Sequence, residues 1–380
     1  MNYKVLFIDD DAFMLKALLR TAKRIRPSWT FFGCEQASNW LTLVSEVGSP
    51  DIIICDYQMP EINGEQVLLQ AMAHCPAAVR VLLTGDTSEH IVTRACRFSH
   101  HIVGKPFTED NLLEVLQCVE RLQRLPLSAA SRTQLGQLQE LPVLPALVQQ
   151  LKALLQAPDA ELVQVATLIQ HEPALAAKLV QLANSAFMGF TRPVSNILEA
   201  VLRLGSKLVE AIVTMHSIDK QFSDKLPPAE HLHITQVAFE HALYAKKLAS
   251  YAGLTSAEQD TVFSAAIFGA IGGLIEAAAL PDAGQALSPP PLMQTGFSNS
   301  TLISVYMLTL WGHAEALCNV LLWQDTPSPQ GNAIEQLSFI LFLAKQLVIP
   351  MQQADLPRLQ EIIDSEQLLA AFNRLLAERT

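Results

Sequence analysis

The stretch Ile52–Pro60, which is written IIICDYQMP, decides the fold of the first part of the chain. Four apolar residues lead to an aspartate, Asp56, and a turn that contains Pro60 follows. A short apolar run bounded by a turn is typical of a strand that is buried on both faces. Runs of the same kind occur at Lys4–Ile8, Thr30–Gly33, Val79–Leu83 and His101–Val103.

Helical patterns separate these five runs. Apolar residues follow helical spacing in Phe13–Arg24 and Gly64–Met72, and the amphipathic stretch Leu112–Leu125 stops at Pro126. Strand and helix patterns that alternate along a chain predict a parallel sheet with helices on both faces. We therefore expect a doubly wound α/β domain with a five-stranded parallel sheet over residues 1–125.

The strand pattern ends after a linker that we place at residues 126–136. Pro173 stands where a helix can begin, because its missing N–H is no loss there. We expect an all-α domain over residues 137–335 and a helical extension over residues 336–380. Its helical patterns include Leu162–Ile169, Leu198–Met215, His231–Tyr251, Thr261–Ala279 and Ser300–Leu322.

The composition is that of a folded, reduced protein. Half of the residues are hydrophobic and 17% are charged, and the six cysteines show no CxxC spacing. The most apolar windows, Val262–Ile275 and Leu337–Pro350, fall short of the ~20 residues of a membrane span, so we expect core helices. The first residues lack the pattern of a signal peptide, and we expect a cytoplasmic protein.

The distribution of charge argues against nucleic-acid binding. The net charge is −11, and no lysine or arginine occurs between Leu248 and Ala344. Binding to a phosphate backbone depends on a cluster of such residues. A transcription factor is a weak hypothesis for the same reason, and because no helix-turn-helix pattern is evident.

Polar residues with related chemistry stand at the ends of the predicted strands. Asp9, Asp10 and Asp11 follow the first strand, Asp56 ends the third, Thr84 ends the fourth and Lys105 follows the fifth. The carboxyl ends of neighbouring parallel strands meet at one edge of the sheet. Carboxylates gathered there would repel one another without a cation, and Mg²⁺ prefers such oxygen ligands.

This set of residues predicts phosphoryl transfer. Asp56 would attack the phosphoryl group in line, Lys105 would pair with its oxygens, and the Thr84 hydroxyl would donate a hydrogen bond to the product. The alternative is that the three aspartates form a solvated turn and that Asp56 caps a helix. Four features in order, each at a strand end, favour the chemical interpretation.

Residues 1–125 resemble the response-regulator receiver family, whose fold is flavodoxin-like. The resemblance implies that Asp56 is the phosphoacceptor, Thr84 a switch hydroxyl, and Lys105 a lysine before a cis-proline, Pro106. The acidic pair would be Asp9 and Asp10. It implies a Mg²⁺ site made by the acidic pair, Asp56 and the Gln58 carbonyl, and the usual turn at Met59-Pro60 and Gly64.

One position departs from the receiver pattern. The family often carries tyrosine or phenylalanine three residues before the lysine, and this chain has Ile102 there. The family's coupling of the threonine to a moving aromatic ring is therefore in question, although phosphorylation itself is not.

The second half resembles the HD-related output domain, HDOD. The residues that carry the resemblance are LPVLPALVQQL (141–151), IQHEPALAAKLVQLANSA (169–186) and ILEAVLRLGSKLVEAIV (197–213). The parent HD superfamily hydrolyses phosphate esters at a metal site made of histidines and aspartates. Where that superfamily has His-Asp, this chain has Gly269-Ala270, which cannot bind a metal, and His241 alone stands where the first histidine would be.

We therefore predict a cytoplasmic two-component response regulator. A sensor histidine kinase would phosphorylate it, and the helical domain, without a cofactor, would act by binding a downstream signalling protein rather than as an enzyme. The helix Leu112–Leu125 could transmit the change or support a homodimer. The alternative is a receiver-regulated phosphodiesterase or nucleotide phosphohydrolase, which Gly269-Ala270 and the scarcity of basic residues oppose.

Overall fold

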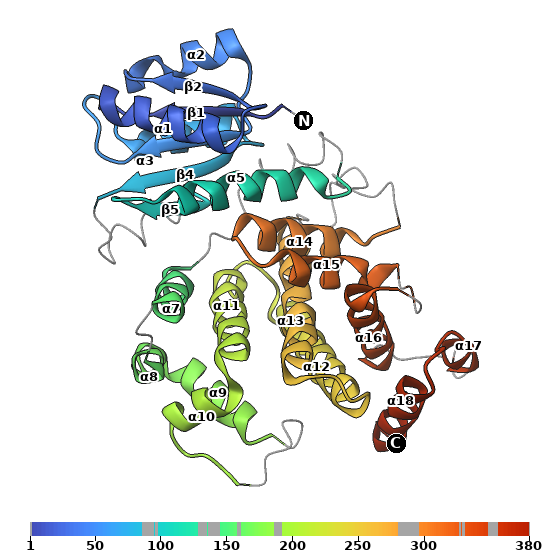
Figure 1. Ribbon diagram of the computed structural model, residues 1–380. Coiled ribbons are helices and arrows are strands. Elements are labelled where there is room, and N and C mark those ends of the chain that lie inside the picture. The colour runs from blue at the N-terminus through green and yellow to red at the C-terminus, as the bar shows by residue number, and fades with distance from the viewer. Residues whose placement is uncertain are drawn as a thin grey trace. The chain divides into compact units, whose positions relative to one another are not determined.

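The computed structural model describes residues 2–85, 95, 98–127, 135, 145–157, 161–185, 192–279, 296–326, 328, 331–348 and 356–379 (Figure 1). The chain divides into two compact units, Met1–Ala146 with Tyr306–His313, and Leu147–Val305 with Ala314–Thr380. Most of the linker expected at residues 126–136 lies outside the described residues. The limits of the domains therefore stay predictions.

Five parallel strands form the sheet of the first unit, which confirms the predicted fold. They lie in the order β2-β1-β3-β4-β5, the order of a doubly wound sheet. Every residue of β3 and β4 is buried, as their continuous apolar sequences require. The strands are β1 (Lys4–Ile8), β2 (Thr30–Cys34), β3 (Ile52–Asp56), β4 (Val79–Thr84) and β5 (His101–Gly104).

Helices cover both faces of this sheet. Leu18 of α1 (Ala12–Ile25) and Leu112 of α5 (Glu109–Arg124) face Ile54 and Val81 on one side. On the other side, α2 (Trp40–Val47) and α3 (Gly64–His74) share a core with Leu6, Ile53 and Leu82. A short 3₁₀ helix, η1 (Ala37–Asn39), precedes α2.

Helix α5 begins three residues earlier than the apolar pattern predicts. Its N-cap is Thr108, whose side chain accepts a hydrogen bond from the Asn111 N–H, while the Asn111 side chain accepts one from the Thr108 N–H. This reciprocal cap satisfies two backbone donors that the helix leaves free, and Glu109 and Asp110 favour the positive end of the helix dipole. Polar residues thus extend the helix beyond its apolar face.

Beyond residue 145, the regular elements among the described residues are all helices, as predicted. Helix α9 begins at Pro173, the position that the sequence indicated. The helices are α7 (Ala146–Gln156), α8 (Leu162–Gln170), α9 (Pro173–Ala183), α10 (Ile197–Leu204), α11 (Ser206–Phe222), α12 (Pro228–Tyr251), α13 (Ser256–Ala279), α14 (Asn299–Leu310), α15 (Glu315–Leu322), η3 (Trp323–Asp325), α16 (Ala333–Val348), α17 (Leu356–Glu361) and α18 (Glu366–Arg379).

Two stretches that the sequence pattern predicts as continuous helices are each broken in two. Gly205 separates α10 from α11 with φ of 80°, and Gly312 separates α14 from α15 with φ of 73°. These backbone angles lie in the left-handed region, which glycine adopts without a steric cost. Apolar spacing carries on across such a turn, so periodicity alone does not reveal the break.

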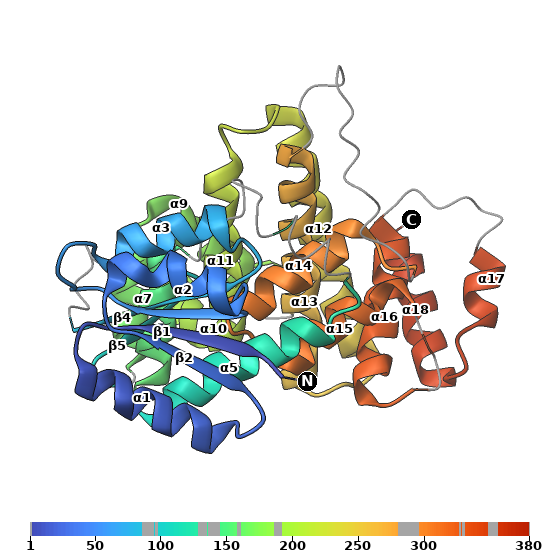
Figure 2. The same cartoon turned by 90° about the horizontal axis from the view of Figure 1, so that it is seen from above.

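Helix α13 forms much of the helical core (Figures 1 and 2). It packs along α12, and both views show the two helices side by side. Among the described residues, α13 alone is long and apolar enough to cross a membrane, over Ser256–Ala278, but 67% of that window is buried inside the protein. The burial is that of a core helix, in agreement with the sequence analysis.

Gly272 allows α13 to approach the start of α14 closely. A Cβ atom at Gly272 would lie 1.8 Å from the Ser300 carbonyl oxygen, a backbone atom that cannot move aside. The Gly272 N–H donates to the Ser304 hydroxyl at 2.8 Å, and that hydroxyl lies 3.2 Å from the Gly269 carbonyl. Close approach and hydrogen bonds together fix this crossing of helices.

We expect Gly272→Ala to lower the free energy of unfolding of the helical unit by about 2–4 kcal/mol, because the methyl group has no space. Gly269→Ala is the matched control, since its Cβ would lie 3.7 Å from Leu321 Cδ1. That change should be neutral or stabilise by about 0.5–1 kcal/mol, the ordinary helix preference for alanine. Thermal unfolding followed by far-UV circular dichroism measures the midpoint temperature of each variant. Equal midpoints for Gly272→Ala and Gly269→Ala would contradict the close contact at Gly272.

Candidate functional site

The candidate site lies at the carboxyl edge of the sheet. Asp9 directly follows β1, Asp56 ends β3 and Thr84 ends β4, while Lys105 directly follows β5. Because these four strands are consecutive neighbours in the sheet, their carboxyl ends meet at one edge. The structure therefore brings together the residues that the sequence analysis selected from separate motifs.

Three carboxylates gather at this edge. Asp9 and Asp56 are buried, at 1% and 8% exposure, whereas Asp10 is exposed. One oxygen from each lies within 4.8 Å of the others, which is close enough for a shared cation. Within the described residues, this is the group of three or more acidic, histidine or cysteine side chains that can hold a metal ion.

Lys105 pairs with both buried carboxylates. Its Nζ atom lies 2.7 Å from Asp56 Oδ1 and 3.2 Å from Asp9 Oδ2. Burial raises the pKa of Asp56, and Lys105 opposes part of that rise. Burial by itself would lower the pKa of Lys105, but the hydrogen bonds and charges of Asp56 and Asp9 outweigh it and raise the pKa. The lysine is therefore a positive charge held beside Asp56, the predicted phosphoacceptor.

Asp11 has a different role from the two aspartates before it. Its side chain accepts hydrogen bonds from the Phe13 and Met14 N–H groups and so caps α1. The Asp11 N–H in turn donates to Asp9 Oδ1 at 2.9 Å. Asp11 thus orients both α1 and the side chain of Asp9. Only Asp9 and Asp10, of these three aspartates, belong to the acidic cluster.

The turn after Asp56 depends on Gly64. A Cβ atom at Gly64 would lie 2.2 Å from the Asp56 carbonyl oxygen, so a side chain would push the turn away from β3. The Gly64 N–H donates to the Tyr57 carbonyl at 3.0 Å. Gln58, the expected carbonyl ligand, is exposed in this turn, and its role as a ligand stays a prediction.

Thr84 and Lys105 are connected through the backbone. Thr84 is buried at 1% exposure, and its carbonyl accepts a hydrogen bond from the Lys105 N–H at 2.7 Å. The bond between Lys105 and Pro106 is cis, as the receiver resemblance implies. The Thr84 hydroxyl, the Lys105 ammonium group and Asp56 thus stand at adjacent strand ends.

The donor set of the edge suits a hard divalent cation. Carboxylate oxygens from two neighbouring strand ends are the ligands that Mg²⁺ prefers. Three carboxylates against one lysine leave the cluster with excess negative charge, which a divalent cation would offset. The residues present therefore fit the predicted magnesium site.

The residue in place of the family's aromatic ring belongs to the core of one face. Ile102, in β5, packs against the cluster that contains Ile53, Val67 and Leu82. An aromatic side chain close to the site occurs instead at Phe107, two residues after Lys105, on the α1 and α5 side of the sheet. The sequence analysis missed Phe107; its position directly after Lys105-Pro106 is the signal that could have found it.

A thiol lies beside the backbone of Asp56. Cys55 is fully buried, and its Sγ is 3.3 Å from the Asp56 carbonyl oxygen, to which the thiol donates. Burial, strengthened by the neighbouring charge of Asp56, raises the pKa of Cys55 well above its usual value. The side chain is therefore a neutral thiol.

In the helical unit, the residues that the sequence analysis compared with an HD-type site are His241, Gly269 and Ala270. His241 is buried, and its Nε2–H donates to the Leu341 carbonyl at 2.8 Å. Gly269 and Ala270 offer no side-chain ligand atom, and the Gly269 carbonyl lies beside Ser304. Burial lowers the pKa of His241 to about 4, so the imidazole is neutral.

Polar groups near His241 pair with one another. Asp325 accepts hydrogen bonds from the Ser298 N–H and hydroxyl, at 2.8 and 2.7 Å, and Lys345 Nζ lies 3.3 Å from it. The charge of Lys345 lowers the pKa of His241 further, and the charge of Asp325 opposes this. These contacts connect the start of α14 with η3 and α16, which is a structural role.

Two protein families match the chain. The response regulator receiver domain matches residues 5–117, and the HDOD domain matches residues 141–327. The chemotaxis protein CheY of Listeria monocytogenes serovar 1/2a is 31% identical over 117 residues, which are 30% of this chain and 95% of that protein. CheY of Listeria innocua serovar 6a matches with the same figures.

Solved structures with similar folds include an HDOD domain protein with unknown function from Geobacter sulfurreducens. It is 20% identical, covers 62% of this chain and 84% of its own, and has a TM-score of 0.42. A putative metal-dependent phosphohydrolase from Shewanella amazonensis SB2B is 19% identical, covers 71% of this chain and 99% of its own, and has a TM-score of 0.46.

The buried imidazole predicts a dependence of stability on pH. The folded pKa of His241 is about 4 against an ordinary 6.5, so the unfolded chain binds its proton first as the pH falls. Stability that is present above pH 6.5 is therefore lost between 6.5 and 4, by roughly 3 kcal/mol in full. We expect His241→Gln, which keeps a donor for Leu341, to lose less thermal stability between neutral pH and pH 5 than the wild type. An equal loss would contradict the assignment.

Proposed function

The chain belongs to the two-component response regulators that carry a receiver domain and an HDOD domain, and on this premise we propose that phosphorylation of Asp56 controls protein binding by the helical domain. The observation that carries the proposal is the cluster at the carboxyl edge of the sheet. There, Asp56 lies beside two further aspartates and 2.7 Å from the Lys105 ammonium group.

The residues of this edge would divide the chemistry of phosphoryl transfer among them. A carboxylate oxygen of Asp56 attacks the phosphorus atom, the bond from phosphorus to the donor nitrogen breaks, and an acyl phosphate remains on Asp56. Lys105 then moves from the Asp56 carboxylate to the phosphoryl oxygens, because these carry more negative charge than the carboxylate did. Thr84, at the end of the adjacent strand, donates its hydroxyl hydrogen to the same group.

A bound Mg²⁺ would neutralise the charge that develops on the phosphoryl oxygens. Asp9, Asp10, Asp56 and the Gln58 carbonyl are the groups that would hold it. The tight turn at Gly64 keeps Gln58 next to β3, and the cap at Asp11 fixes the direction in which α1 leaves the site. These contacts orient the ligands before the phosphodonor arrives.

For the helical domain we propose binding rather than catalysis. Gly269 and Ala270 lack ligand atoms, and the His241 imidazole is already used by the Leu341 carbonyl. The phosphohydrolase alternative would need a metal site here that the described residues do not provide. A phosphorylation-dependent equilibrium between two states of the chain would then expose or cover a surface for another protein.

The proposed partners follow from this scheme. A sensor histidine kinase would donate the phosphoryl group, and a cytoplasmic signalling protein would bind the output domain. Self-association through α5 is a further hypothesis. Nucleic acid is excluded from the proposal because no lysine or arginine occurs between Leu248 and Ala344.

We expect Mg²⁺ and phosphoramidate to add one phosphoryl mass to the wild type and none to Asp56→Asn, because an amide is no nucleophile here. Asp11→Asn is the matched control, since asparagine also caps helices and Asp11 stands outside the acidic cluster. It should gain the same mass as the wild type. Intact-mass spectrometry measures all three, and a phosphorylated Asp56→Asn would overturn the assignment.

We also expect the bound partner to depend on phosphorylation. Affinity capture from source-cell lysate compares wild type in Mg²⁺ and beryllofluoride, which mimics the phosphoryl group, with Asp56→Asn under the same conditions. At least one protein should be enriched on either the wild type or Asp56→Asn but not on both, because the two forms populate different conformational states. Identical sets of captured proteins would contradict gated binding.

A further inference from the structure

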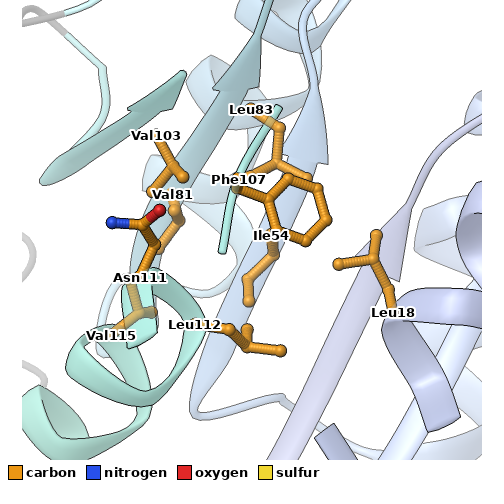
Figure 3. Close-up of a pocket in the computed structure, with 9 residues that line it drawn as sticks. All are labelled: Leu18, Ile54, Val81, Leu83, Val103, Phe107, Asn111, Leu112 and Val115. Atoms are coloured by element: carbon orange, nitrogen blue, oxygen red, sulfur yellow. The ribbon is translucent and has the colours of Figure 1, made fainter. Parts of the chain in front are cut away.

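A small apolar cavity lies between the sheet and the helices α1 and α5 (Figure 3). Its volume is about 10 Å³, at the lower limit for holding one water molecule. Figure 3 shows the Phe107 ring among Leu18, Ile54 and Leu112. The side chains that line it are Leu18, Ile54, Val81, Leu83, Val103, Phe107, Asn111, Leu112 and Val115.

The cavity leaves Phe107 incompletely packed. Eight of its lining side chains are apolar, so water is not stabilised there. Close-packed core side chains move only at the cost of their contacts, whereas a ring beside unfilled space has room to shift. Phe107 is half-buried, in contrast to Leu18, Ile54 and Val81, which are fully buried. Phe107 is therefore the aromatic side chain of this lining that combines incomplete burial with adjacent free space.

The backbone joins Phe107 directly to the phosphorylation site. Phe107 follows Lys105 by two residues, and Lys105 Nζ lies 2.7 Å from Asp56 Oδ1. Phosphorylation would remove the negative charge of the Asp56 carboxylate and place more negative charge on the phosphoryl oxygens. Lys105 would then exchange its ion pair with the carboxylate for one with the phosphoryl group. The Lys105 N–H is held by the Thr84 carbonyl at 2.7 Å, which fixes the backbone on that side of the lysine, and the two residues that follow it are Pro106 and Phe107.

Ile102 is poorly suited to carry the same signal. It is β-branched, which restricts its rotamers, and it packs in the core on the opposite face of the sheet. The aromatic ring that can respond to Lys105 therefore lies on the α1 and α5 face.

We propose that Phe107 is the conformational switch of the receiver domain: when Lys105 re-pairs with a phosphoryl group on Asp56, the Phe107 ring shifts within the cavity and changes its packing on Leu112 and Val115, so that α5 transmits the signal. The inference rests on the proposed phosphorylation of Asp56. It adds a route through the α1 and α5 face.

Hydrogen–deuterium exchange on the full chain, with and without Mg²⁺ and beryllofluoride, tests the switch. In the wild type, exchange of backbone amides in α5 should change by about threefold or more on adding beryllofluoride, since packing controls local opening. Phe107→Leu, which keeps an apolar side chain without the ring, should lose most of that change. Ile102→Val, on the other face, should retain it.

An α5 response in Phe107→Leu equal to that of the wild type would overturn the proposal, as would equal losses in both variants. Should Phe107→Leu not fold, Phe107→Met serves in its place, because a flexible side chain fills the space without a ring. Phosphorylation of each variant is measured separately by intact mass. If the wild type gains no phosphoryl mass, the proposed function itself is contradicted. If Phe107→Leu gains the phosphoryl mass but exchange in α5 does not change, the switch is supported.

Discussion

Repulsion between two buried carboxylates, and its relief by one lysine, organises the carboxyl edge of the sheet. Asp9 and Asp56 are almost fully buried, and Lys105 contacts both. Buried charges are stable only when they are paired, so β1, β3 and β5 have to end in register for this contact to form. The parallel sheet supplies that register, and the charge cluster in turn couples three strands that are separate in sequence.

The same constraint explains the details around the cluster. Asp11 caps α1 and donates its backbone N–H to Asp9, and Gly64 lets the following turn lie against the Asp56 carbonyl, so both residues help to position the carboxylates. An excess of negative charge remains after Lys105 is counted, and this excess is what makes the edge receptive to a cation. The arrangement of charges at this edge therefore bears both on where the strands end and on whether a cation can bind there.

Sequence patterns predicted the strands to within a residue at each end, because strands buried on both faces have continuous apolar sequences between polar ends. The residues of the candidate edge could be predicted for the same reason. The breaks at Gly205 and Gly312, and the crossing at Gly272, could not, since each depends on a neighbour distant in sequence or on a backbone angle. The position of Phe107 beside a cavity likewise arises only when α1 and α5 pack together.

Cys55 bears on how long a signal would last. An aspartyl phosphate is a mixed anhydride, and a thiolate attacks such an acyl group readily. The sulfur next to Asp56 stays protonated, because burial and the adjacent negative charge raise its pKa. Cys55 also points to the opposite face of β3 from the Asp56 carboxylate, since successive side chains of a strand alternate. If Asp56 is phosphorylated as proposed, hydrolysis rather than transfer to this thiol would end the signal, and its duration would depend on the access of water to Asp56.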